Sequence, residues 1–393
     1  MKAATLSVGF IALTDAAPLI AAQEMGFAAE EGIELDLIRA PSWSSLRDML
    51  VFGRIEAAHM LSPVPVASAM GLGGTGAPIS AVAVLSVNGT VIGVSNEMAA
   101  RLAGVGHDFA FNDARAAGAA LIAAKDPARP LRIGVPFPFS MHAELLYYWL
   151  SALGLPAPQS VSIHTVPPPL MAQAIAAGEI DAFCVGEPWG SITVENGAGA
   201  LLLPGKAIWQ FAPEKVLAVR TDWAENEDAL LGRLIRALWR AGRWLAQPAS
   251  RSLAAEILSA PDYLNLPAEV LDRALTGRLT ISSRGEMRDV PGFIGFHRGT
   301  ANFPWRSQAE WIALQLAART GLDRDRAIRA GRTAFRSDLY RTALAGTEAD
   351  MPGASLKVEG GVQTETSIAS EAGRLSLLPD QFFDGRIFEP YTP

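Results

Sequence analysis

Two segments in the first half of the chain resemble each other at one constant offset of 125 residues. The run LSVGF at 6–10 is matched by LRIGV at 131–135, which places a glycine at the same strand position in both. The run GRIEA at 53–57 is matched by GEIDA at 178–182, and 178 minus 53 is again 125. One such match arises easily by chance between α/β segments, but several at one offset indicate an internal repeat.

The stretch between these landmarks has helical periodicity in both copies. Leu46 and Leu50 fall opposite Met171 and Ile175, which are the i and i+4 apolar positions of a helix. Each copy therefore has the order strand, helix, strand, helix, strand. Right-handed crossovers between parallel strands give open sheets with ligand sites beyond the carboxyl ends of the strands. We predict an α/β protein of two lobes with a ligand cleft between them.

The remaining sequence is divided between the lobes. We expect 1–92 and 215–393 to form lobe 1 and 93–214 to form lobe 2, because KVLAVR at 215–220 is a short apolar strand that returns to the first lobe. A strongly amphipathic helix is expected over 227–245. Further helices are expected at 250–258, 267–275, 307–318 and 323–330. The C-terminal stretch, rich in Gly, Ser, Thr and Glu, is expected to be an extended tail that wraps the body or is partly mobile.

Composition excludes several classes of function. The chain has 393 residues, of which 50% are hydrophobic, so it can bury a sizeable core. A net charge of −7 without a run of clustered Lys or Arg argues against direct nucleic-acid binding. The single cysteine, Cys184, excludes an intramolecular disulfide and a cysteine-built zinc site. The five histidines lack metal-ligand spacing, so we expect no metal and no cofactor.

The sequence favours binding over catalysis and predicts a cytoplasmic location. It lacks a Gly-x-Ser-x-Gly elbow, a phosphate-binding loop ending in Lys-Ser/Thr, and a His-Glu-x-x-His motif. Met1 and Lys2 lead into an apolar run that Thr14 and Asp15 interrupt early, which is typical of a first strand and not of an export signal. No later run reaches transmembrane length, so no membrane contact is expected.

The strand-to-helix junction of the second copy is suited to an anion. Ser140 is a plausible N-cap, and His142 then lies in the first helical turn, where free backbone N–H groups and the helix dipole favour negative charge. The alternative is a surface histidine without a ligand. Asp15 occupies the matching junction of the first copy, where we expect it to cap the first helix and to leave the anion nearer the other lobe.

Three other residues are candidates for the cleft. Trp43 lies in a loop after the second strand, where Ser44 or Ser45 can cap the next helix; it is either a core residue or a cleft wall with an indole donor. Gly186 ends a strand and allows a ligand to approach its backbone N–H. Lys215 is either a solvated surface charge or a compact positive charge for a small anion.

Six motifs together resemble one family of proteins. They are GFIALTDAAP at 9–18, SWSSLRD at 42–48, VPPP at 166–169, DAFCVGEPW at 181–189, PEK at 213–215 and FDGR at 383–386. This set resembles the nitrate-binding proteins of nitrate/bicarbonate-type ABC transporters, which are type II periplasmic-binding-protein-like and two-lobed. A cytoplasmic branch of the family, the NasS-like nitrate/nitrite sensors, holds an ANTAR-type RNA-binding antiterminator (NasT-like) until ligand releases it. With no export signal visible, the chain looks most similar to that branch.

The resemblance also implies a ligand set. The family's nitrate pocket uses residues that match Trp43, His142, the backbone N–H of Gly186, and Lys215. Bicarbonate-binding relatives replace the lysine with an acidic residue and recruit calcium, so Lys215 implies nitrate or nitrite without a metal. Thr90 stands where nitrate transporters commonly have a glutamine, and its shorter hydroxyl leaves the choice between nitrate and nitrite open.

These observations predict a nitrate/nitrite-binding sensor that sequesters an antiterminator and controls nitrate assimilation genes. The first alternative is the substrate-binding component of a nitrate ABC transporter. The second is an enzyme on the same two-lobed fold, for which His142 is the candidate general base.

Overall fold

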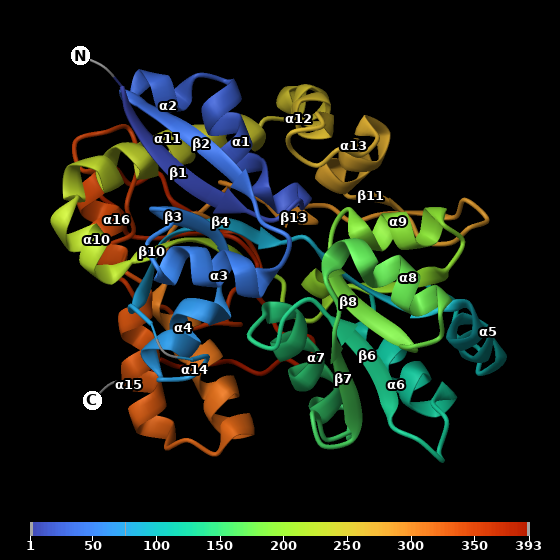
Figure 1. Ribbon diagram of the computed structural model, residues 1–393. Coiled ribbons are helices and arrows are strands. Elements are labelled where there is room, and N and C mark those ends of the chain that lie inside the picture. The colour runs from blue at the N-terminus through green and yellow to red at the C-terminus, as the bar shows by residue number, and fades with distance from the viewer. Residues whose placement is uncertain (1–2, 75, 391–393) are drawn as a thin grey trace.

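The computed structural model describes residues 3–74 and 76–390 and contains two α/β lobes, each built on its own sheet (Figure 1). Met1 and Lys2, on which the expectation about export rests, lie outside the described residues. No helix in the described part of the chain is both long and apolar enough to cross a membrane.

Lobe 1 has a mixed six-stranded sheet. Its strands, in spatial order, are β13 (Ile294–Gly295), β4 (Ile79–Asn88), β10 (Pro213–Arg220), β3 (Ala57–Leu61), β1 (Ala4–Phe10) and β2 (Ile33–Arg39). Strand β1 is parallel to β2 and β3, whereas β10 runs antiparallel to β3 and β4. In β10, Val216 and Ala218 belong to one apolar cluster and Leu217 and Val219 belong to another, so both faces of the sheet are buried.

Helices cover both faces of this sheet. One cluster packs against α1 (Ala17–Glu24), α2 (Phe27–Glu30), α10 (Thr221–Asn226), α11 (Asp228–Leu245), η4 (Pro248–Ser250), α12 (Arg251–Ser259), α13 (Ala268–Thr276) and α16 (Ser337–Leu344). The other packs against α3 (Trp43–Val51), α4 (Pro63–Ala69), α14 (Arg306–Thr320) and α15 (Arg324–Ala334). The predicted helices over 227–245, 250–258, 267–275, 307–318 and 323–330 are confirmed as α11 to α15, and α16 is additional.

Lobe 2 has a five-stranded sheet. Its strands, in spatial order, are β7 (Val161–Thr165), β6 (Leu131–Val135), β8 (Ala182–Gly186), β5 (Thr90–Ser95) and β9 (Gly199–Pro204). Its helices are α5 (Asn96–Gly104), α6 (Ala114–Ala124), α7 (Met141–Ala152), η2 (Pro168–Leu170), α8 (Met171–Ala176), α9 (Trp189–Glu195) and η3 (Gly205–Ala207). Two small ribbons complete the fold: β11 (Arg278–Thr280) with β12 (Met287–Asp289), and β14 (Thr366–Ser367) with β15 (Ser376–Leu377).

The 125-residue repeat is visible in how one helix packs on the first strand of each copy, α3 on β1 and α8 on β6. A Cβ placed on Gly9 would lie 2.4 Å from Leu46 Cδ1, and one placed on Gly134 would lie 3.0 Å from Met171 Sδ. Residues 46 and 171 are the pair that the sequence repeat placed opposite each other. In both copies a glycine therefore lets the helix pack closely on the strand.

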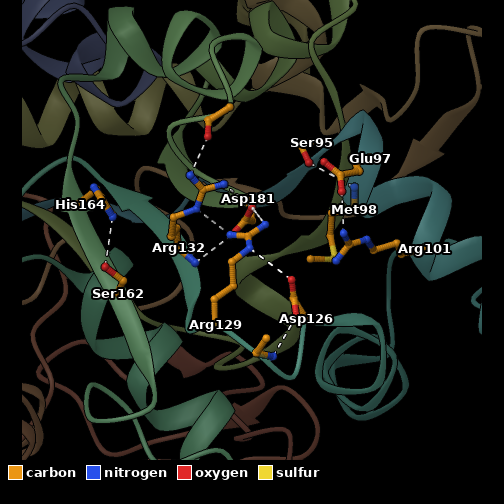
Figure 2. Close-up of polar contacts among 12 residues, drawn as sticks. Ser95, Glu97, Met98, Arg101, Asp126, Arg129, Arg132, Ser162, His164 and Asp181 are labelled. Atoms are coloured by element: carbon orange, nitrogen blue, oxygen red, sulfur yellow. Dashed lines mark hydrogen bonds and ion pairs between the residues drawn. The ribbon is translucent and has the colours of Figure 1, made fainter.

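The repeat also conserves one polar contact between neighbouring strands. The Ser7 N–H donates to Glu56 Oε2 at 2.7 Å, and the Arg132 N–H donates to Asp181 Oδ2 at 3.0 Å. In lobe 2 the arginine side chains of Arg129 and Arg132 also bind this carboxylate (Figure 2). Burial raises the pKa of Asp181, but these hydrogen bonds outweigh burial and hold it at about 2.

The chain first crosses between the lobes at Gly89, a few residues before the expected boundary at 92. Gly89 has a φ of +90°, and a Cβ there would lie 3.0 Å from Ile294 Cδ1, so the crossing requires glycine. The second crossing follows β9, through η3, to β10. The expected division also placed all of 215–393 in lobe 1, whereas Leu279 and Phe293 pack in the lobe 2 cluster that contains Phe183.

The C-terminal tail packs against the body. The Phe382 ring is stacked on Trp209, with centroids 4.8 Å apart, and on Trp311, at 5.7 Å. The Tyr148 hydroxyl of α7 donates to Asp384 Oδ1 at 2.8 Å. The tail therefore contacts elements of both lobes.

Candidate ligand-binding site

Lys215 is buried at the start of β10, immediately after the second crossing. Its side chain has no exposed surface, and its Nζ lies 2.7 Å from Asp15 Oδ2 and 2.8 Å from Glu214 Oε1. Burial lowers the pKa of Lys215, but the two carboxylates outweigh burial and keep it above its usual value. An unpaired buried ammonium would cost several kcal/mol. The alternative of a solvated surface lysine is therefore excluded.

A bulge in β10 brings two successive side chains to this point. Neighbouring residues of a regular strand face opposite sides of the sheet. The register against β4 shifts between Pro213 and Lys215 and again between Lys215 and Val216. These irregularities let Glu214 and Lys215 turn toward one site, because extra residues in a bulge rotate the side-chain directions.

Asp15 takes part in this site and does not cap the first helix, contrary to the sequence-based expectation. It lies in η1 (Thr14–Ala16), and the N-cap of α1 is Ala16, without a side-chain cap. Asp15 Oδ1 is 2.9 Å from His59 Nε2, in addition to its contact with Lys215. Burial raises the pKa of Asp15, but Lys215 and His59 outweigh burial and hold it far below the usual range.

Trp43 is the first residue of α3 and faces the lysine. The N-cap is Ser42, whose Oγ accepts from the Ser45 N–H at 3.2 Å, so the predicted cap at Ser44 or Ser45 is wrong. The Trp43 ring centroid lies 5.5 Å from Lys215 Nζ, within cation–π distance. Its Nε1 is buried and has no hydrogen-bond partner among the described residues. A buried indole N–H without a partner indicates a place for a ligand acceptor.

His142 approaches the same point from lobe 2. Ser140 caps α7, as predicted, by accepting from the Ala143 N–H at 3.2 Å. His142 is fully buried, with Nδ1 3.3 Å from Glu214 Oε1, so the alternative of a surface histidine is excluded. Its Nε2 has no hydrogen-bond partner in the described part of the chain. Burial, together with Lys215, lowers the pKa of His142 well below its usual value.

Gly186, at the end of β8, completes this group. A Cβ on Gly186 would lie 3.7 Å from Asp15 Oδ2 and 3.8 Å from His142 Nε2. The Glu187 N–H donates to Gly89 O at 3.1 Å. Since N–H groups alternate in direction along an antiparallel ladder, the Gly186 N–H points away from β5. It is therefore available to a ligand at the strand end.

Thr90 lies beside this group. It is buried and pairs with Gly186 in the β5–β8 ladder. A Cβ on Gly205 would lie 2.1 Å from Thr90 Oγ1, which has no hydrogen-bond partner among the described residues. The structure thus brings Trp43, His142, Gly186 and Lys215 together and places Thr90 on the neighbouring strand.

Sequence reasoning missed three members of the site. Glu214 and His59 were not candidates, and Asp15 was assigned to a structural role. The adjacency of Glu214 to Lys215 was the available signal for the first. No local pattern indicates His59, which meets Asp15 because β3 lies beside β1 in the sheet.

The two lobes are in contact around the site. The Thr14 N–H donates to Glu187 O at 2.9 Å, and Trp189 Nε1 donates to Ala12 O at 2.8 Å. A separate cavity of about 540 Å³ lies beside the lobe crossing, lined in part by Asn88, and contains none of the predicted ligand residues. Among the described residues, no group of three or more His, Cys, Asp or Glu is arranged to hold a metal ion.

This arrangement offers hydrogen-bond donors to a small anion. Lysine has three N–H donors, and two of those of Lys215 face Asp15 and Glu214, which leaves one. The Trp43 indole of lobe 1 and the Gly186 N–H of lobe 2 add neutral donors. The carboxylates hold the ammonium in place and offset its charge.

Comparisons with known proteins agree with this architecture. The model of the NMT1-like family matches residues 1–259. The chain is 30% identical over 406 residues to the nitrate/nitrite binding protein NrtA of Synechococcus elongatus, covering 99% of this chain and 84% of NrtA. It is 33% identical over 314 residues to the nitrate import ATP-binding protein NrtC of Synechocystis sp., covering 79% of this chain but only 45% of NrtC.

A solved structure extends the agreement to the fold. The crystal structure of the periplasmic nitrate-binding protein NrtA from Synechocystis PCC 6803 superposes with a TM-score of 0.82 at 27% identity, covering 99% of this chain and 96% of that chain. The predicted two-lobed periplasmic-binding-protein fold is confirmed, and the relatives support a binding protein over an enzyme. The chain belongs to the NMT1-like family.

Proposed function

We propose that this protein is a solute-binding protein that holds nitrate or nitrite between its lobes. The observation that carries the proposal is a buried Lys215 ammonium beside Trp43 and, across Glu214, beside His142. In the part of the chain that the structure describes, Trp43 Nε1 and His142 Nε2 have no hydrogen-bond partner. The name of the NrtA relative supports the choice of ligand.

Binding from both lobes couples the ligand to lobe closure. Trp43 and Lys215 belong to lobe 1, whereas His142 and Gly186 belong to lobe 2. An anion that bridges these donors has its full set of contacts only when the lobes are closed. A tenfold shift toward the closed form requires about 1.4 kcal/mol of differential binding, which one or two charge-assisted hydrogen bonds supply.

Delivery of the anion to a nitrate ABC transporter is the role that the relatives support, because NrtA and NrtC carry the names of binding and import proteins. The second candidate is the cytoplasmic sensor that holds an ANTAR-type antiterminator and releases it with ligand. It rests on the sequence resemblance to the sensor branch, and it requires the open and closed forms to differ in affinity for that partner.

Calorimetry tests the ligand. We expect saturable binding of nitrate or nitrite, and no binding of taurine or of bicarbonate with or without calcium. Trp43→Phe keeps the ring and removes the indole N–H, so it should weaken binding about tenfold. Trp209→Phe is the matched control, because Trp209 Nε1 is also buried without a hydrogen-bond partner in the described chain but lies in the tail contact. Absence of saturation with both nitrogen oxyanions would refute the proposal.

Partner binding tests the role. The protein is mixed with the ANTAR antiterminator and, separately, with the nitrate permease complex in nanodiscs. Each mixture is measured without nitrate and with about 1 mM nitrate, which is the upper end of common ligand affinities. Delivery predicts that the nitrate-loaded protein binds the permease. The sensor role predicts a complex with the antiterminator that dissociates when nitrate is added.

A further inference from the structure

The charges around Lys215 do not by themselves favour the binding of nitrate. Asp15 and Glu214 provide two buried carboxylates against one ammonium, and both histidine side chains are buried. With neutral imidazoles the cluster carries one net negative charge. Nitrate would raise this to two inside a site without exposed side chains, which is costly in a low-dielectric interior.

The position of His142 sharpens the problem. Its Nδ1 lies 3.3 Å from Glu214 Oε1, which also contacts Lys215 Nζ. A nitrogen lone pair facing an ionised carboxylate is repelled, so in the neutral ring the proton resides on Nδ1. The Nε2 atom, 3.8 Å from the Cβ position of Gly186, then presents a lone pair to the ligand space. A lone pair cannot bind an oxyanion.

One added proton resolves both difficulties. If it binds Nε2, the ring becomes an imidazolium that donates to the anion through Nε2 and to Glu214 through Nδ1. If it binds Glu214, the carboxylic acid donates to Nδ1, and the neutral ring carries its own proton on Nε2. Both arrangements contain one more proton than the ionised, ligand-free site, and both present an N–H to the anion.

We propose that nitrate enters this site together with one proton, which is held by the His142–Glu214 pair. This inference rests on the proposed function, and it means that the binding of nitrate is regulated by pH.

The groups around the pair come from five elements. Lys215 of β10, Asp15 of η1 and Cys184 of β8 interact with the pair itself. His59 of β3 contacts Asp15, and Trp43 of α3 contacts Lys215. Asp15 is held ionised by Lys215 and His59, and burial raises the pKa of the Cys184 thiol well above its usual value, so neither exchanges a proton near neutrality. His59 Nε2 lies 2.9 Å from Asp15 Oδ1, whereas His142 and Glu214 border both Lys215 and the Gly186 position, so we assign the uptake to the His142–Glu214 pair.

The pH range follows from the carboxyl. Burial raises the pKa of Glu214 to about 7, and Lys215 opposes this only in part. Below pH 7 the ligand-free site already holds the proton, so binding takes up little. Above pH 7 uptake approaches one proton, and the apparent affinity for nitrate should fall up to about tenfold per pH unit.

Calorimetry in buffers of different ionisation enthalpy measures the uptake directly. Nitrate is titrated at pH 6 in MES, phosphate and imidazole and at pH 8.5 in Tris, bicine and triethanolamine, after each buffer alone has shown no heat of binding. We expect the slope of observed enthalpy against buffer enthalpy to give about one proton at pH 8.5 and close to none at pH 6. Saturable nitrate binding with no buffer dependence at pH 8.5 would overturn this inference and leave the proposed function intact.

Two variants locate the proton. Glu214→Gln should abolish the uptake and make the affinity independent of pH. Glu359→Gln is the matched control, because Glu359 is also buried, with a pKa raised by burial, but contacts Lys357 and Ser307 instead of the ligand residues. Loss of uptake in Glu359→Gln, with uptake retained in Glu214→Gln, would contradict the assignment. If Glu214→Gln does not fold, the buffer dependence of nitrate binding to the wild-type protein still tests this inference. Failure of the wild-type protein to bind nitrate at any pH would instead refute the proposed function.

Discussion

Arg319 on α14 lies 2.9 Å from the carboxylate of Glu144 on α7, so an ion pair joins the lobes two residues beyond His142. The same guanidinium donates to Pro138 O at 3.0 Å. The Glu144 side chain is only 1% exposed. The C-terminal helices therefore hold the segment of lobe 2 that carries the histidine.

Removal of this ion pair should weaken ligand binding. Arg319→Gln leaves Glu144 buried without its cation, which disfavours the closed arrangement by about 1 to 2 kcal/mol. We expect the Kd for nitrate, measured by calorimetry at pH 7, to rise roughly tenfold. The double variant Arg319→Gln, Glu144→Gln should recover most of the loss, because no unpaired carboxylate remains. Unchanged affinity in the single variant would show that the pair does not support closure.

A methyl group on Gly186 should exclude the ligand and leave the fold intact. The added Cβ would lie 3.2 Å from Leu13 Cδ2, a flexible side chain that can move by a few tenths of an ångström, and 3.8 Å from His142 Nε2. We expect Gly186→Ala to lose at least tenfold in affinity with little change in thermal stability. Gly104→Ala is the control, because nothing lies within 4 Å of its Cβ position. Wild-type affinity in Gly186→Ala would place the ligand elsewhere.

Stability should depend on pH through Glu187. Burial raises the pKa of Glu187 to about 7, and the hydrogen bond that its Oε2 accepts from the Ser191 N–H opposes this only in part. Because the folded-state pKa is raised, the group favours folding most below pH 4.5, and this contribution is lost as pH rises through 7. Urea unfolding at pH 5 and pH 8 should show Glu187→Gln gaining about 2 to 3 kcal/mol relative to wild type over that range. Parallel stability curves for the two proteins would contradict the assignment.

Substitution of the repeat glycines, Gly9 in lobe 1 and Gly134 in lobe 2, should lower the free energy of unfolding by similar amounts. Gly9→Ala brings a methyl group to 2.4 Å from Leu46 Cδ1, and Gly134→Ala brings one to 2.6 Å from Ile180 Cδ1. We expect each to cost about 1 to 3 kcal/mol in the free energy of unfolding, as for other overpacked cores. Gly353→Ala, whose Cβ would meet only Ala369 O at 3.6 Å, should be close to neutral. Denaturant titration of the three variants makes the comparison.

The sequence was sufficient for features that repeat or have a local pattern. The offset of 125 residues predicted both sheets, and helical periodicity predicted α11. The cap of α7 at Ser140 followed from its residue type, whereas Asp15 in the matching position forms η1. Ser140 and Asp15 thus occupy equivalent positions of the repeat but have different roles, because the residues around them differ between the two lobes.

The acidic part of the site could not be predicted because it depends on topology. Asp15, His59 and Glu214 are far apart in sequence: His59 meets Asp15 because β3 lies beside β1, and Glu214 joins them because β10 inserts, antiparallel, between β3 and β4. The bulge that turns Glu214 toward Lys215 leaves no local signature in the sequence. The matched sequence landmarks of the repeat end before β10, although β10 follows β5 at the same offset of 125 residues and takes the equivalent place in the lobe 1 sheet.

The partners of Lys215 make its charge a fixed part of one lobe. Asp15 and Glu214, which hold the Lys215 ammonium, belong to lobe 1, as the lysine itself does. His142 and Gly186 come from lobe 2. A change in the angle between the lobes would therefore leave the ammonium in its own setting and move these two residues relative to it.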